Sequence, residues 1–288
     1  LTIRCLIRPG DEVLIVEPSF VCYRPIVSLC GGVPVVIETK EENEFRLTAD
    51  ELREKITDKT KLLVLPYPNN PTGAIMRRED LEAIAKVLKD TNIMIASDEI
   101  YSELTYSGKH CSIAEIEGMR ERTIVINGFS KSFAMTGWRL GFLGGPKEIV
   151  SQMLKLHQYA IMSSPTVSQY AAIVAMHSCQ KDIDAMRNEY NIRRRFVVDS
   201  FNKLGLKCFA PQGAFYVFPC IKSTGMTSTD FCEKLVYTKK VAVVPGDAFG
   251  ECGEGYVSVS YAYSLNHLRE AIKRIGEFLE DIKNGNVQ

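Results

Sequence analysis

One lysine in this sequence stands just after an apolar run and close to an arginine. Residues 123–126 read Thr-Ile-Val-Ile, Lys131 follows among small residues, and Arg139 comes eight positions later. An amine that is half-buried near other cations loses its proton readily and can attack a carbonyl group to form a Schiff base. The planar guanidinium of an arginine can hold a phosphate. This spacing fits a ligand with a carbonyl and a phosphate, and a solvated strand-to-helix turn fits this segment alone equally well.

Polar side chains also follow two other apolar runs. Residues 61–65 lead to Asn70, and residues 93–96 lead to Asp98. In open α/β sheets, ligands bind at the carboxyl ends of the strands. We therefore expect an amide, a carboxylate and the amine of Lys131 to meet in one crevice.

Each of these residues has an ordinary structural explanation too. The Asn-Asn-Pro-Thr-Gly segment around Asn70 is a good turn sequence. Asp98 could cap a helix, and Tyr101, three residues later, could be an aromatic packed in the core. Their common position at strand ends, in this order, makes a shared ligand the better explanation. A reactive lysine with a phosphate-binding arginine is what pyridoxal 5′-phosphate (PLP) requires of a protein.

The order of apolar and helical patterns predicts the fold of the first half. Strands are expected at 12–16, 33–37, 61–65, 93–96, 123–126 and 140–143, and helices at 23–29, 48–56 and 79–89. Strands that alternate with helices and are apolar on both sides form a largely parallel sheet covered on both faces. Residues 1–8 look like the end of an amphipathic helix. We therefore expect a fragment of a longer protein, whose large domain, residues 1–183, is incomplete at its N-terminus.

The pattern changes after residue 183. A long helix is expected at 184–204, then short strands at 207–209, 214–218, 241–244 and 256–261, and a last helix at 265–282. These elements predict a second domain, residues 184–288, that begins with the long helix. The fold class is therefore α/β, with a mostly parallel sheet in the large domain and a smaller α+β domain at the C-terminal end.

Composition and charge argue against several other functions. The 288 residues are 45% hydrophobic, and 35 Lys and Arg balance 35 Asp and Glu, so nothing favours nucleic acid or an anionic membrane surface as a partner. No apolar run is long enough to span a bilayer. The nine cysteines are scattered without a C-x-x-C pair, which indicates free thiols in a reducing cytoplasm and predicts no metal site.

Three segments together resemble the class I/II aminotransferases, the aspartate aminotransferase-like enzymes of PLP fold type I. They are Pro-Asn-Asn-Pro-Thr-Gly at 68–73, Ser-Asp-Glu-Ile-Tyr at 97–101 and Ser-Lys-Ser-Phe-Ala-Met-Thr-Gly-Trp-Arg at 130–139. The resemblance covers essentially the whole chain and extends to residues 9–13 and 211–216. It implies PLP fold type I, PLP as cofactor, and transfer of an amino group from an amino acid to a 2-oxo acid. It also implies a homodimer.

The resemblance implies roles for individual residues. Lys131 would form the Schiff base with PLP and later move the proton at the substrate Cα. Asp98 would keep the pyridinium nitrogen protonated, so that the ring accepts electrons. Asn70 and Tyr101 would hydrogen-bond the 3′ oxygen of the ring, and Asn70 would also lie near the substrate. Arg139 would bind the phosphate.

Two more residues match the family's pattern. Phe20, in Glu-Pro-Ser-Phe at 17–20, takes the place of the aromatic ring that stacks on the cofactor. Ser130 could add a hydrogen bond to the phosphate. A loop aromatic that covers the core is the alternative explanation for Phe20.

The sequence departs from the family in two respects. The family's N-terminal arm and its glycine-containing phosphate loop would lie before residue 1. In the smaller domain, the family has a Tyr-Val-Arg-Ile-Ser-Tyr-Ala type strand whose arginine binds the substrate carboxylate. Here residues 256–262 read Tyr-Val-Ser-Val-Ser-Tyr-Ala, with Ser258 at that place. A serine cannot supply a charged two-pronged contact, so either substrate binding is impaired or another cation, such as Arg24, holds the carboxylate.

Two other functions stay open from the sequence alone. A PLP-dependent lyase of the C–S type would use the same fold and the same electron sink. A catalytically impaired homologue, or a binding module without activity, would be consistent with Ser258. Production of a 2-oxo acid without amino transfer would identify the lyase, and failure to take up PLP would identify the non-catalytic homologue.

Overall fold

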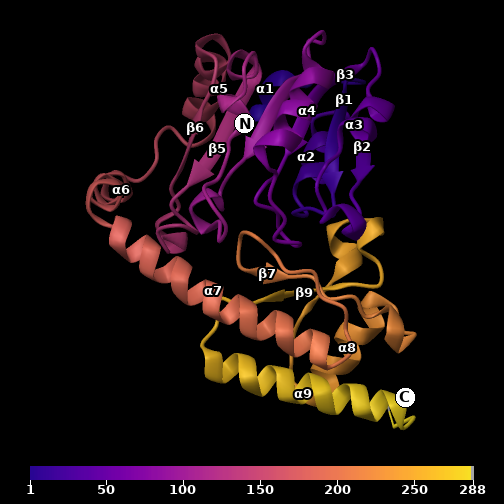
Figure 1. Ribbon diagram of the computed structural model, residues 1–288. Helices are drawn as coiled ribbons and strands as arrows, with labels where there is room; N and C mark the ends of the chain where they lie inside the picture. Colours follow the sequence, from indigo (N-terminus) through magenta and orange to yellow (C-terminus); the bar gives the residue numbers. More distant parts are fainter. Residues whose placement is uncertain (287–288) are drawn as a thin grey trace.

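A six-stranded sheet forms the centre of the first half of the chain (Figure 1). In the computed structural model, which describes residues 1–286, its strands follow the order β2-β1-β3-β4-β5-β6. β6 is antiparallel to β5, and all other neighbours are parallel, which confirms the mostly parallel sheet. The strands are β1 Glu12–Glu17, β2 Val33–Glu38, β3 Thr60–Leu65, β4 Met94–Asp98, β5 Thr123–Gly128 and β6 Gly141–Gly144.

Helices cover both faces of this sheet because its strands are apolar on both sides. The helices are α1 Thr2–Leu6, α2 Tyr23–Leu29, α3 Ala49–Lys55, α4 Arg78–Leu88 and α5 Lys147–Ala160. Leu14 and Val16 of β1 share a core with residues of α3 and α4. Val13 and Ile15, which alternate with them, share a different core with residues of α1 and α2.

Local sequence signals start and orient these helices. Thr48 Oγ1 accepts the Glu51 N–H at 3.2 Å, and the Glu51 carboxylate accepts the Thr48 N–H at 2.9 Å, so α3 begins with the predicted capping box. In α4, the buried side chains recur with helical spacing at Leu81, Ile84 and Leu88. The parallel strands and helices α2, α3 and α4 therefore form where the apolar periodicity predicts them.

The second half of the chain is organised around the long helix α7. Its sheet is small and antiparallel, in the order β7-β9-β8. The elements are α6 Thr166–Ser178, α7 Gln180–Lys203, β7 Tyr216–Val217, α8 Ser228–Lys239, β8 Val244–Pro245, β9 Val257–Ser260 and α9 Leu265–Lys283. Helices α7 and α9 run side by side next to this sheet (Figure 1). Apolar side chains of α7, α8 and α9, among them Val197, Leu235 and Phe278, form a separate core.

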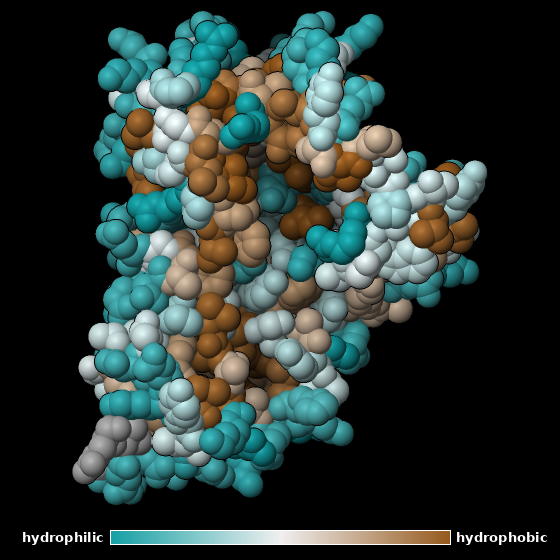
Figure 2. Space-filling view, turned by 180° about the vertical axis from the view of Figure 1, so that it is seen from behind, coloured by the Kyte–Doolittle hydropathy of each residue, from teal (hydrophilic) through white to brown (hydrophobic). Residues whose placement is uncertain are grey.

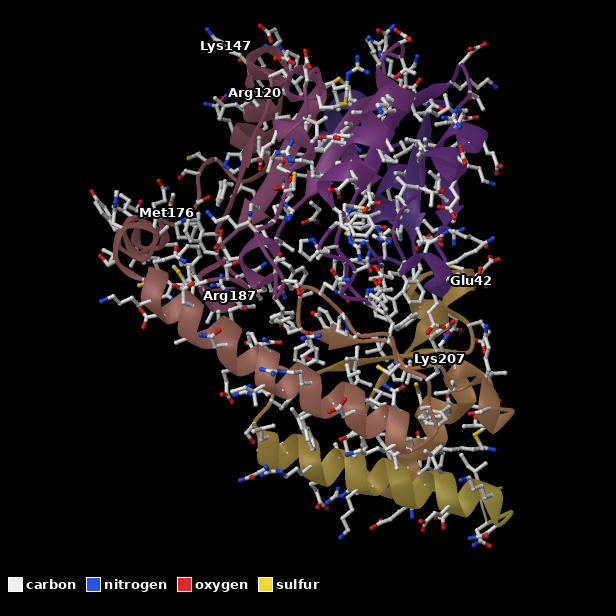
Figure 3. The ribbon with its side chains drawn as sticks, viewed as in Figure 1. Glu42, Arg120, Lys147, Met176, Arg187 and Lys207 are labelled. Atoms are coloured by element: carbon white, nitrogen blue, oxygen red, sulfur yellow. The ribbon has the colours of Figure 1, made fainter. Side chains whose placement is uncertain are left out.

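Backbone and side-chain contacts join the two halves. The N–H groups of Gln212 and Gly213 both donate to Gly73 O at 2.9 Å. Arg187 of α7, labelled in Figure 3, donates from Nη1 to Glu103 O at 3.4 Å. Gly73 and Glu103 lie in loops that follow β3 and β4. The smaller half is therefore attached at the strand ends where the sequence predicts a ligand.

Several expectations for the second half were wrong in extent. β7, β8 and β9 cover 216–217, 244–245 and 257–260 rather than the longer runs expected, and 207–209 form no strand. In that segment, Lys207 O accepts the Cys220 N–H, and the Cys208 N–H donates to Asn202 Oδ1. These separate hydrogen bonds take up the backbone groups that would otherwise pair in a strand ladder. Helix α7 begins at Gln180 rather than 184, and the sequence patterns did not predict α5, α6 or α8.

Gly73 has no room for a side chain at the junction of the halves. Its φ is +70°, and a Cβ built on it would lie 2.2 Å from Pro211 Cβ. Gly118 has a similar φ of +74°, with no atom within 4 Å of a Cβ. Gly118→Ala should therefore lower the free energy of unfolding only through backbone strain, by on the order of 1 kcal/mol. Gly73→Ala should lower it by about 1–3 kcal/mol more, because its Cβ overpacks the junction. Urea unfolding would measure the difference, and equal losses in the two variants would contradict the tight junction.

Candidate active site

One cavity lies at the carboxyl ends of β3, β4 and β5, which are neighbours in the sheet. Asn70 follows β3, Asp98 ends β4 and Lys131 follows β5, and all three side chains line this cavity, as the strand order predicts. The lining residues are Phe20, Tyr23, Pro66, Pro68, Asn70, Asp98, Ile100, Tyr101, Ile126, Lys131 and Tyr216. Ten of them come from the first half of the chain, and Tyr216 of β7 comes from the second.

A tight turn directly after β5 brings Lys131 to the cavity. The Ala134 N–H donates to Lys131 O at 3.1 Å, and the Met135 N–H donates to Phe129 O at 3.1 Å. Phe129 is buried, and its ring contacts that of Phe133 with the centroids 5.1 Å apart. The apolar residues of the turn are thus anchored in the protein, which leaves the lysine at the strand end.

Two aromatic rings lie near the partly buried amine of Lys131. Its Nζ is 5.8 Å from the centroid of the Tyr101 ring and 5.6 Å from that of Phe215. Partial burial, and to a lesser extent the positive charge of Arg139, lowers the pKa of Lys131 from its usual range. More of this amine is therefore uncharged at neutral pH than of a solvated lysine. The uncharged amine is the form that attacks a carbonyl group.

Asp98 is held by two hydrogen bonds. Tyr23 Oη donates to Asp98 Oδ2 at 2.8 Å, and the Ile100 N–H donates to Oδ1 at 3.3 Å. Burial raises the pKa of Asp98, and these two hydrogen bonds oppose the rise without cancelling it. A cationic group placed beside Asp98 would therefore be bound favourably, because it would stabilise the ionised carboxylate.

Tyr23 and Tyr216 are site residues that the sequence reasoning missed. Tyr23 lies in α2, three residues after Phe20, where a tyrosine on a short helix reads as ordinary packing. Tyr216 shares a hydrogen bond with Tyr101 between their hydroxyl oxygens, 3.0 Å apart. Burial, and then Tyr216, raises the pKa of Tyr101. The Phe-Tyr pair of residues 215–216 lay within the family resemblance and was the available signal for Tyr216.

The predicted phosphate and stacking residues are near the cavity. Phe20 lines it, and 46% of Phe20 is exposed, which does not fit an aromatic that covers the core. Ser130 and Arg139 are not among the lining residues, but both are tied to the lysine turn through Thr136. The Thr136 hydroxyl donates to Ser130 O at 2.7 Å, and Arg139 Nη1 donates to Thr136 O at 2.8 Å.

Ser258 lies on β9, outside the lining of this cavity. It is 5% exposed and borders a separate hollow beside β8 and α9. Tyr216 pairs with Ser260 across the sheet, and side chains alternate along a strand. Ser258, two residues from Ser260, therefore lies on the same face of the sheet as Tyr216. Arg24, the alternative cation, forms an ion pair with Glu17, with Nε 3.1 Å from the Glu17 carboxylate.

The influence of Arg139 on Lys131 can be measured in the cofactor-free protein. We expect Arg139→Gln to raise the pKa of Lys131, because a nearby positive charge disfavours a protonated amine. The pH dependence of Lys131 acetylation, read by peptide mass spectrometry, reports this pKa. Arg120→Gln is the control, since Figure 3 places Arg120 at the opposite end of the sheet. An acetylation midpoint that Arg139→Gln leaves unchanged would contradict the coupling.

Within residues 1–286, no helix is long and apolar enough to cross a membrane, and no group of three or more His, Cys, Asp or Glu residues is placed to hold a metal ion.

Comparison with known proteins identifies the family of this chain. The family model described as aminotransferase class I and II matches residues 1–275. The aspartate aminotransferase of Pyrococcus abyssi is 48% identical over 280 residues, which cover 96% of this chain and 72% of that protein. Aromatic-amino-acid aminotransferase 2 of Thermococcus litoralis has the same identity and coverage.

Solved structures lead to the same conclusion. The aromatic aminotransferase of Pyrococcus horikoshii matches with a TM-score of 0.96 at 46% identity, covering 98% of this chain and 76% of that one. The aspartate aminotransferase of Thermus thermophilus with maleate matches with a TM-score of 0.92 at 36% identity, covering 96% and 72%. These matches confirm the α/β architecture of PLP fold type I. The chain therefore belongs to the class I and II aminotransferases, the transaminase family that its three motifs predicted.

Proposed function

We propose that this chain transfers an amino group from an amino acid to a 2-oxo acid with PLP held in the Lys131 cavity. One observation carries the proposal: an amine with a lowered pKa, a half-buried carboxylate and a buried amide oxygen without a partner among the described residues line the same cavity. When bound, PLP supplies a carbonyl carbon for the amine and a ring that accepts electrons from the substrate Cα.

The residues of the cavity fit this cofactor. Asn70 Oδ1 is buried and has no hydrogen-bond partner among the described residues, which costs free energy until a ligand satisfies it. If the amide turns over, Asn70 presents Nδ2 as a donor instead. Asn70 and Tyr101 would hold the ring oxygen of PLP, and Asp98 would keep a proton on the ring nitrogen. Burial raises the pKa of Asp98, and a protonated ring nitrogen beside it would favour the ionised carboxylate.

Lys131 would both hold the cofactor and move a proton. Its Nζ would be the base that takes the proton from the substrate Cα and later gives it up. A base works best when its pKa lies near the working pH, and burial together with Arg139 moves the pKa of Lys131 in that direction. Arg139 would bind the phosphate, Ser130 would add a hydrogen bond to it, and Phe20 would stack on the ring.

We also propose that the enzyme is a cytoplasmic homodimer, with residues 1–183 and 184–288 as its two domains. Large apolar side chains are exposed along α6, including Val167, Tyr170 and Ile173. Figure 2, the view from behind, shows hydrophobic residues in a band down the middle of the molecule and in a smaller group on the projection at the right, where α6 lies. Extended apolar surfaces on proteins are typical of interaction sites, which supports self-association. The nine cysteines are free, which suits a reducing compartment.

The assignment of Lys131 can be tested by fixing the cofactor on the protein. We expect borohydride reduction of the PLP-loaded protein to leave a stable pyridoxyl label on Lys131, found by peptide mapping. The label should appear on that residue because its amine is uncharged more often than that of a solvated lysine. Lys131→Ala is the control and should carry no label. A label on a different lysine in the parent would overturn the assignment.

Ser258 gives a prediction about substrate affinity. An arginine fork holds a carboxylate by two charged hydrogen bonds, whereas a serine offers one neutral hydroxyl. Ser258 does not line the cavity, but it lies on the sheet face that it shares with Tyr216. We propose that substrate carboxylates are held weakly because this face of β9 offers only a serine, and that Ser258→Arg lowers KM and raises kcat/KM at least tenfold. Charged, desolvated pairs are typically worth about 2–5 kcal/mol, which allows such an effect.

Ser258→Gln is the matched control for this prediction, because it adds length without charge. Steady-state kinetics with an amino-acid panel would give KM and kcat/KM for the parent and both variants. Lower activity in Ser258→Arg, with both variants folded, would show that the carboxylate is bound elsewhere. The same conclusion would follow if the parent already saturates at ordinary amino-acid concentrations.

A further inference from the structure

A buried carboxylate lies directly behind Asp98. Glu99 is 4% exposed, and its Oε1 accepts hydrogen bonds from the hydroxyls of Ser97, at 2.8 Å, and Ser112, at 2.6 Å. Its Oε2 is 2.8 Å from Nε2 of His110. Asp98 lines the Lys131 cavity, whereas Glu99 and His110 line a different hollow. The two consecutive carboxylates therefore face opposite ways, as alternation at a strand end requires.

The backbone of Glu99 is fixed at the same point. Its N–H donates to Ile126 O of β5 at 2.8 Å, and its carbonyl oxygen accepts the Ser102 N–H at 2.9 Å. Side chain and backbone together hold the residue between Asp98 and the turn that carries Tyr101. A rotation of Glu99 would therefore move both Asp98 and Tyr101 relative to the cavity.

A buried carboxylate at this position costs free energy. Burying a charge costs several kcal/mol unless it is paired and hydrogen-bonded, and an apolar side chain of similar size would avoid that cost. Burial raises the pKa of Glu99, but the hydrogen bond and charge of His110 and the two hydroxyl donors outweigh burial, so the net shift is downward. The site is thus built to keep Glu99 ionised and in one orientation.

We propose that Glu99, held by His110 and Ser112, is a positioning residue that keeps the turn of residues 98–101 in the conformation that points Asp98 and Tyr101 into the cavity. This inference deepens the proposed function and rests on it for its catalytic consequence. His110 contacts neither Asp98 nor Lys131 in the hydrogen bonds described for residues 1–286, so it acts through Glu99.

Backbone hydrogen exchange of the cofactor-free protein tests the positioning without relying on PLP. We expect His110→Ala to accelerate exchange in the 98–102 segment at least tenfold, while peptides covering β1 exchange as in the parent. His110→Gln should restore slow exchange, because its side-chain amide can donate where Nε2 does. Glu103→Ala, an exposed carboxylate on the same loop, is the control and should behave as the parent.

Kinetics of the loaded enzyme then test the catalytic consequence. We expect kcat to fall about tenfold in His110→Ala, KM to change less than twofold, and His110→Gln to recover most of kcat. A folded His110→Ala with parental exchange at 98–102 would overturn the positioning role. Faster exchange over the whole sheet, not confined to this segment, would also overturn it, because that is the result of general destabilisation.

The two proposals fail in different ways. If Lys131 carries no pyridoxyl label in the parent, the proposed function is wrong, while local exchange in His110→Ala still decides whether Glu99 positions the turn. If Lys131 is labelled and His110→Ala shows parental exchange and kcat, the proposed function stands and Glu99 is only a buried charge.

Discussion

The site depends on removing a lysine amine from water without giving it a counter-charge. In water, the pKa of a lysine keeps nearly all of its amine protonated at neutral pH, and a protonated amine is no nucleophile. Here partial burial and the positive charge of Arg139 lower that pKa. The aromatic rings of Tyr101 and Phe215 border the amine. Phe215 comes from the second half of the chain, so both halves contribute to the surroundings of this amine.

The same cavity also contains a carboxylate whose charge is disfavoured by burial. Asp98 is half-buried, and burial raises its pKa, so the cavity presents a carboxylate that a cation would stabilise together with an amine whose pKa is lowered. A ligand with a basic ring nitrogen and a carbonyl carbon can satisfy both groups at once. Tyr23 in front of Asp98 and the Glu99–His110 pair behind it hold the carboxylate's surroundings in place. The two halves of the molecule thus contribute to one electrostatic arrangement.

Much of this arrangement could be read from the sequence because it follows from strand ends. Asn70, Asp98 and Lys131 each follow an apolar run, and parallel neighbours end at the same edge, so their meeting required no knowledge of side-chain contacts. Tyr23 and Glu99 could not be found in this way. The function of each depends on a side-chain contact that no strand pattern predicts, namely with Asp98 for Tyr23 and with His110 for Glu99. The lengths of the strands in the second half were overestimated because they too depend on distant contacts. β7 and β8 each extend only as far as their pairing with β9.

We expect the cofactor of this enzyme to alternate between two forms, and absorbance can follow this directly. The PLP-loaded protein should change its visible absorption band on addition of an amino acid from a panel that includes aspartate, glutamate and the aromatic amino acids. A 2-oxo acid, added after excess amino acid is removed, should restore the first band and be converted to its amino acid. No change with any member of the panel would contradict the account, and so would release of a 2-oxo acid that leaves the first band in place.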